Sequence, residues 1–114
     1  MSALETSLTE TPRAPRRRTL FAGIVIHGLA SFTLDCAIRD VSENGARVRL
    51  SALAHLANPI VLVAPSLDTA HEAVVAWQDG QDIGLKFVRR VDLQAPTSDL
   101  DRITRRLWLE RRAR

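Results

Sequence analysis

The sequence predicts a mainly β protein, a six-stranded antiparallel barrel with a C-terminal α-helix and a flexible N-terminal arm. Short apolar stretches recur at intervals of roughly 8–12 residues, which is typical of all-β domains with short connections. Turn-forming pairs such as Asn44-Gly45 and Asp79-Gly80 separate several of these stretches. Towards the end of the chain the apolar residues change to a spacing of three and four, which indicates a helix. A chain of 114 residues has room for one such domain.

The pattern of apolar residues predicts where the six strands lie. They span residues 20–27, 32–41, 46–50, 60–64, 72–78 and 82–88, with a loop or helical turn over 51–57. In the second strand Phe32, Leu34, Cys36 and Ile38 form an apolar face and the residues between them a more polar one. This alternation is typical of a sheet that covers a core on one side. At this length, closure of the sheet into a barrel would also remove its exposed edges.

The two ends of the chain differ from the barrel segment, which we place at residues 12–92. Residues 1–11 are small, polar and without periodicity, so we expect them to be disordered. Pro12 and Pro15 bracket an arginine-rich stretch, and because proline disfavours a helix, residues 12–18 are expected to form an extended or turning arm. At the other end Ser98 and Asp101 match the capped start of a helix over residues 98–114, which packs on the barrel or mediates self-association.

The composition argues against several classes of protein. Cys36 is the one cysteine, which excludes an internal disulfide framework and is compatible with a reducing cytoplasm. No apolar run approaches the roughly 20 residues of a membrane span, and no secretory signal is recognisable, so we expect a soluble cytoplasmic protein. The three histidines are scattered, and the sequence has no phosphate-binding glycine motif and no serine nucleophile elbow. We therefore expect no metal, no cofactor and no enzymatic activity.

The bulky residues of the fifth strand and of the helix are expected to pack rather than to bind. Val74, Val75 and Trp77 are predicted to lie in the core or at its rim, and Trp108 under the helix. For both tryptophans, packing is favoured over stacking on a ligand base, because large aromatic side chains most often bury their area in a core.

Two motifs carry the functional prediction. In the arm Arg13 and Arg17 form an RxxxR pattern, and about twenty residues later Asp40-Val41-Ser42-Glu43-Asn44-Gly45 forms a DxSxxG pattern at a strand junction. This order and spacing resembles the PilZ domain family, as do the stretches Arg16–Leu20, Asp35–Val48 and Ile83–Phe87. The resemblance covers about residues 12–88 and implies a PilZ-like β-barrel, similar to short PilZ proteins of alphaproteobacteria. The final helix is similar to the one that follows many PilZ barrels.

The resemblance implies a receptor for cyclic di-GMP, a dianion with two guanines, which acts on a protein effector. Arg13 and Arg17 would fork onto guanine edges, or stack on the purines while their charges meet phosphate. Asp40 would accept from guanine N–H groups, Ser42 would offer a hydroxyl, and Gly45 would let the backbone approach the ligand. Accessory contacts are expected from Arg16, Arg18 and Asn44. An arm that folds over the anion would convert binding into order.

Plainer explanations stay open beside this one. Residues 13–18 also match a solvated basic tail, Asp40 and Ser42 match side chains that cap a turn, and Asn44-Gly45 matches a hairpin. The alternative function is a PilZ protein that has lost the nucleotide and acts as a protein–protein adaptor. A nucleic-acid-binding barrel is a third hypothesis, but three Phe, two Trp and no Tyr offer few stacking groups, so no DNA or RNA partner is expected. Both a monomer and a homodimer are compatible with the sequence.

Overall fold

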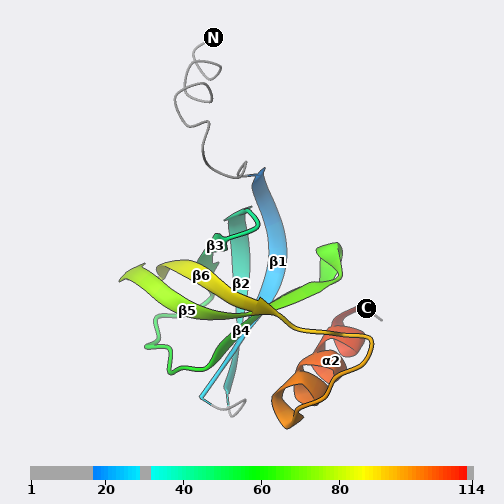
Figure 1. Cartoon of the computed structure of the whole chain (residues 1–114). Coiled ribbons are helices and arrows are strands. Elements are labelled where there is room, and N and C mark those ends of the chain that lie inside the picture. Colours follow the sequence, from blue (N-terminus) through cyan, green and yellow to red (C-terminus); the bar gives the residue numbers. More distant parts are fainter. Residues whose placement is uncertain (1–16, 29–31, 113–114) are drawn as a thin grey trace.

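A computed structural model describes residues 17–28 and 32–112, with the backbone alone for residues 17–20 and 112 (Figure 1). Six strands close into an antiparallel barrel in the order β1-β2-β3-β6-β5-β4. The elements are β1 (Arg17–His27), β2 (Phe32–Val41), β3 (Gly45–Leu50), β4 (Ile60–Ala64), the 3-10 turn η1 (Pro65–Leu67), β5 (Thr69–Asp79), β6 (Asp82–Arg90) and α2 (Asp99–Arg112). The predicted barrel with a C-terminal helix is confirmed, whereas the predictions for residues 1–16 lie outside the described residues.

The first strand begins earlier than predicted. Arg17 and Arg18 were expected in the arm, but they are strand residues, and their backbones pair with Val41 and Asp40 of β2. Their polar side chains and the nearby prolines indicated an arm, yet a neighbouring strand with free backbone groups is enough to extend the ladder. The register shifts by one residue between Arg18 and Phe21. Consequently Arg17, the second arginine of RxxxR, lies at the same end of the barrel as the DxSxxG motif.

The barrel interior is filled by alternate residues of all six strands. Fully or nearly fully buried members of this core include Val25, Ile38, Val48, Ile60 and Ile83. Cys36 belongs to the same core, and burial raises the pKa of its thiol to about 12. The thiol is therefore protonated near neutral pH and acts as a small hydrophobic side chain, as expected from its place in the strand.

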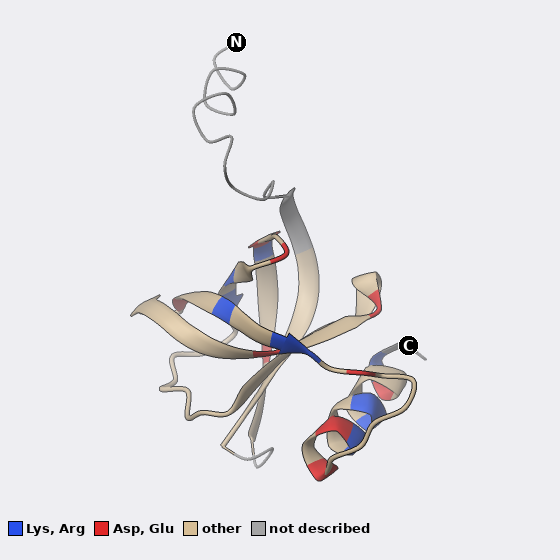
Figure 2. Cartoon of the chain, viewed as in Figure 1, with Lys and Arg blue, Asp and Glu red and all other residues tan. Residues whose placement is uncertain are grey.

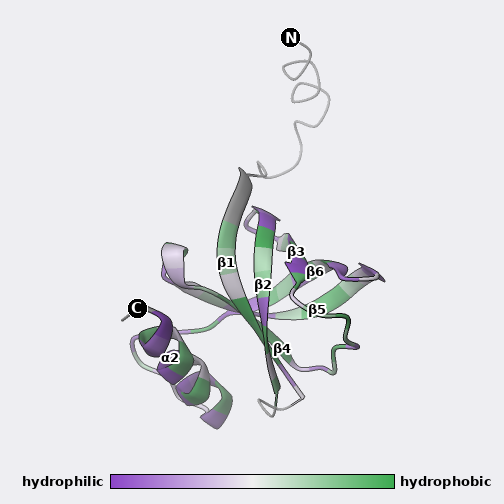
Figure 3. Cartoon of the chain, turned by 180° about the vertical axis from the view of Figure 1, so that it is seen from behind, coloured by the Kyte–Doolittle hydropathy of each residue, from purple (hydrophilic) through white to green (hydrophobic). Residues whose placement is uncertain are grey.

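A second core lies outside the barrel, where α2 covers β1 and β4. The outward residues Ile24, Ile26, Val61 and Val63 pack there with Trp108, which is 4% exposed. Trp108 thus packs under the helix, as predicted. Figure 3 shows apolar and polar residues interspersed along α2, as expected of a helix with one buried face. In the described part of the chain no helix is both long and apolar enough to cross a membrane.

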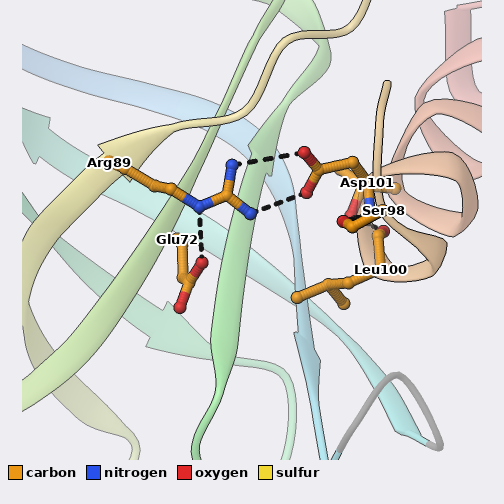
Figure 4. Close-up of polar contacts among 6 residues, drawn as sticks. Glu72, Arg89, Ser98, Leu100 and Asp101 are labelled. Carbon is orange, nitrogen blue, oxygen red and sulfur yellow. Dashed lines mark hydrogen bonds and ion pairs between the residues drawn. The ribbon is translucent and has the colours of Figure 1, made fainter.

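Ion pairs fix both ends of α2 to the barrel. Ser98 caps the helix, since its Oγ accepts from the Asp101 N–H at 3.1 Å. The buried Asp101 carboxylate accepts two hydrogen bonds from Arg89 of β6, at 2.8 and 3.2 Å, and Arg89 also donates to Glu72 (Figure 4). The bonds from Arg89 lower the pKa of Asp101 and raise that of Arg89. At the other end of the helix, Arg111 pairs with Asp35 of β2 at 2.7 Å.

Candidate functional site

Antiparallel pairing brings Arg17 and Arg18 next to the DxSxxG motif at one end of the barrel. Arg17 lies opposite Val41 and Arg18 opposite Asp40, directly before the turn that joins β2 to β3. Arg13 and Arg16 lie outside the described residues, and for Arg17 and Arg18 only the backbone is described. The structure therefore brings the second arginine of RxxxR into the strand next to DxSxxG.

Asp40 lies between arginine positions on both neighbouring strands. It is the second-last residue of β2, is 5% exposed, and pairs in the ladder with Arg18 on one side and Arg47 of β3 on the other. Its Oδ2 is 3.1 Å from Arg47 Nε, which is an ion-pair contact but falls outside hydrogen-bond geometry. Carboxylate oxygens accept hydrogen bonds, so Asp40 offers acceptors at this end of the barrel.

Ser42 organises the turn with both its backbone and its side chain. Its N–H donates to the Gly45 carbonyl at 2.9 Å, and its Oγ accepts from the Asn44 N–H at 3.2 Å. The Phe87 N–H of β6 donates to the Asn44 carbonyl at 2.9 Å, which ties the turn to the barrel. The turn-capping role considered from the sequence is therefore present for Ser42, and it holds the hydroxyl at the surface of the turn.

The reason for glycine at position 45 differs from the sequence-based one. Among the described residues only Gly28, Asp68 and Gly80 have positive φ, so Asn44 and Gly45 do not form the predicted hairpin turn of positive-φ residues. Three residues, 42–44, join the strands instead. Gly45 pairs with Lys86, and an added Cβ would collide with the Leu85 carbonyl oxygen. Glycine is thus required by the close approach of β3 and β6, whether or not a ligand is bound.

The backbone ladders continue the site as one row across five strands. Arg18, Asp40, Arg47, Gly84 and Trp77 are successive ladder partners on β1, β2, β3, β6 and β5. Trp77 is 45% exposed, and its indole lies over Gly84, where a Cβ would collide with it. Sequence reasoning missed this row because no local signal reports which residues of distant strands become neighbours.

The placement of the bulky β5 residues corrects the sequence-based prediction in part. Val75 packs against the core as expected, whereas Val74 and Trp77 are surface residues, 37% and 45% exposed. Trp77 lies on the outside of the barrel because Gly84, which has no side chain, leaves room there for an aromatic ring. Trp77 therefore covers Gly84 and presents the rest of its ring to solvent.

Basic side chains surround the turn. Figure 2 shows Lys and Arg on β2, β3 and β6 near the β2–β3 connection. Arg39 and Lys86 are exposed, and Arg47 is about half exposed (its side chain 43%), while Glu43 is the acidic residue of the turn itself. Together with Arg17 and Arg18, this distribution favours an anionic ligand at this end of the barrel.

His71 and His27 make contacts within the fold. His71 stacks on Phe87 with ring centroids 4.1 Å apart, and burial together with Arg90 lowers the pKa of His71. His27 accepts from the Ala57 N–H through Nδ1 at 3.4 Å. Across residues 17–28 and 32–112, no three His, Cys, Asp or Glu side chains gather in a way that could hold a metal ion.

Comparison with known families agrees with this geometry. The model of the PilZ domain family matches residues 11–106, which include both motifs, all six strands and the first half of α2. No curated protein matches the chain. The matched segment thus contains every residue that the sequence assigned to the site.

Proposed function

Because the chain belongs to the PilZ domain family, we propose that it is a receptor for cyclic di-GMP that signals to a protein partner. PilZ domains are binding and adaptor domains rather than enzymes, and we propose no catalytic activity and no cofactor for this chain. One observation supports the receptor function most: the β1–β2 register sets Arg17 and Arg18 beside Val41 and Asp40. This pairing puts two arginine positions next to the buried Asp40.

The proposed contacts follow from the chemistry of the ligand. Arg13 and Arg17 provide planar guanidinium groups for phosphate and for guanine O6 and N7, with Arg16 and Arg18 as accessory cations. Asp40 accepts from the guanine N–H groups, because it offers acceptors and no donor. Ser42, Asn44 and Gly45 present the turn to the ligand, and the surrounding basic residues offset the charge of a dianion.

The proposed signal is the ordering of the arm. Residues 12–16 lead directly into β1, so an arm whose arginines bind the ligand becomes fixed against the outside of the barrel. The helix α2 is already tied to the barrel by Arg89 and Arg111, so it need not move. A partner protein in the cytoplasm would then distinguish the two states by the arm, without a change in the barrel.

Titration calorimetry of the full chain with cyclic di-GMP tests this proposal. At tens of micromolar protein we expect saturable heat, and Arg17→Ala should remove most of it because a bidentate guanidinium contact is lost. Arg106→Ala, an exposed position on α2, is the matched control and should bind as the wild type does. The absence of heat from the wild type would refute the receptor function.

A ligand-independent adaptor is the second candidate. It is favoured by the fact that Ser42 and Gly45 have sufficient structural reasons in the turn and in the β3–β6 pairing. In that case pull-downs should recover the same partner with and without cyclic di-GMP, and Arg17→Ala should leave recovery unchanged. Recovery that depends on the nucleotide would exclude this candidate.

A further inference from the structure

We propose that Arg47 is a specificity-determining residue of the nucleotide site, which positions the Asp40 carboxylate and turns its remaining donors towards the ligand. The inference rests on the proposed receptor function and adds a residue that belongs to neither the RxxxR nor the DxSxxG pattern. It starts from the ion pair between Arg47 Nε and Asp40 Oδ2, 3.1 Å apart.

A register shift in β2 creates this pair. Ile38 lies opposite Val48, but Asp40 lies opposite Arg47, so β2 has one residue more than β3 at this point. In an unbroken ladder Arg39 would face Arg47, and Asp40 would face Ala46, which is part of the barrel core. The extra residue therefore turns the carboxylate from the core side to the side of Arg47, and such bulges commonly redirect functional side chains.

The Arg47–Asp40 pair differs in its exposure from a second ion pair on β3. Arg49 pairs with Asp82 at 3.2 Å, and both side chains are almost half exposed, 47% and 42%. Asp40 is 8% exposed at its side chain, whereas Arg47 is 43% exposed. An exposed pair is screened by water and contributes little, but a cation beside a buried carboxylate is screened less and can help to hold its direction.

Arg47 also has donors to spare. In the described part of the chain its ion pair with Asp40 is the one polar contact that it makes, and a guanidinium group has five N–H donors. The outer nitrogens therefore remain available to a phosphate or to guanine O6. One side chain would bind the ligand directly and also aim the acceptor that reads the guanine N1–H and 2-amino groups.

The test compares cyclic di-GMP with cyclic di-IMP, which lacks only the 2-amino groups. Calorimetry on the full chain measures both affinities for the wild type, Arg47→Ala, Arg47→Lys and the matched control Arg49→Ala. We expect Arg47→Ala to weaken cyclic di-GMP binding about tenfold or more and to reduce the preference over cyclic di-IMP. Arg47→Lys should recover part of the affinity because it keeps the charge, and Arg49→Ala should stay within about twofold of the wild type.

The outcomes separate the two proposals. If the wild type gives no heat with cyclic di-GMP, both the receptor function and the role of Arg47 are refuted. If the wild type binds but Arg47→Ala behaves as Arg49→Ala does, the role of Arg47 alone is refuted. Equal losses for both dinucleotides in Arg47→Ala would refute the positioning of Asp40, because a specificity-determining residue must change their ratio. Thermal unfolding of each variant, recorded alongside, shows that the compared proteins are folded.

Discussion

Two arginine–carboxylate pairs on the barrel use the same side chains in opposite ways. Arg89 engages two carboxylates with all three of its nitrogens, at 2.8 to 3.2 Å, and so ties α2 to the barrel. Arg47 reaches Asp40 through Nε alone, outside hydrogen-bond geometry. The first guanidinium group uses each of its three nitrogens within the fold, and the second keeps both of its outer nitrogens for another molecule. The number of unused donors, rather than the residue type, separates a structural contact from a candidate binding group.

The largest expected effect on stability is at the Arg89–Asp101 pair. Arg89→Ala leaves the Asp101 carboxylate buried without its cation, which should lower the free energy of unfolding by about 3 kcal/mol. Chemical denaturation measures this loss. Arg90→Ala, at the next and equally exposed position, is the control and should cost less than about 1 kcal/mol. Equal losses for the two variants would mean that Arg89 does not hold the helix.

Gly45→Ala is expected to have the next largest effect, since the new methyl group meets the Leu85 carbonyl oxygen of the neighbouring strand. We expect a loss of about 2 kcal/mol in unfolding free energy. Gly80→Ala is the matched control: nothing lies near its added Cβ, so it should cost about 1 kcal/mol for positive φ alone. A Gly45→Ala protein as stable as the wild type would show that β3 and β6 are less closely paired than described.

The pH dependence of stability provides a smaller test of the ion pair between Arg89 and Asp101. The folded-state pKa of Asp101 is below its ordinary value of 3.8, so its contribution is complete above that pH and is lost as the pH falls through the folded-state value. The difference in unfolding free energy between the wild type and Arg89→Ala should therefore shrink below about pH 4. Denaturation curves from pH 7 down to pH 3 measure it, and a difference that grows on acidification would contradict the assignment.

The smallest effects on stability are expected at the Arg47–Asp40 pair and at the exposed Arg49–Asp82 pair on the same strand. Arg47→Ala removes a single contact that lies outside hydrogen-bond geometry, so it should cost only about 1 kcal/mol, and Arg49→Ala about 0.5 kcal/mol or less. Denaturation curves of the two variants and of Arg89→Ala measure whether the losses in unfolding free energy follow this order. If Arg47→Ala were as destabilising as Arg89→Ala, Arg47 would stabilise the fold as Arg89 does. The contrast between a structural pair at Arg89 and a candidate binding group at Arg47 would then not hold.

Local patterns predicted much of the fold. The bounds of β2 follow from apolar alternation, those of β4 from a continuous apolar run between turn residues, and the C-terminal helix from spacing and from Ser98. The start of β1 was wrong because Arg17 and Arg18 become strand residues only through pairing with β2. Pairing between distant strands is a tertiary property, and local propensity does not report it.

The same limit explains what was missed at the site. The sequence singled out Asp40, Ser42 and Gly45 from their motif, but Arg47, two residues beyond it, was given no role. Its contact with Asp40 depends on a register shift between β2 and β3, which the sequence of either strand alone does not report. Asp101 was likewise expected to act within its own helix, whereas its main partner, Arg89, lies on β6.

The most direct test of the central claim is the amide NMR spectrum of the full chain during addition of cyclic di-GMP. The proposed site predicts progressive shifts of the amides of Ser42, Asn44, Gly45 and Arg47 at the β2–β3 connection. The amides at the start of α2, from Asp99 to Asp101, should stay in place because Arg89 holds that end of the helix. Shifts confined to α2, or no shift at the connection, would contradict a nucleotide site at this end of the barrel.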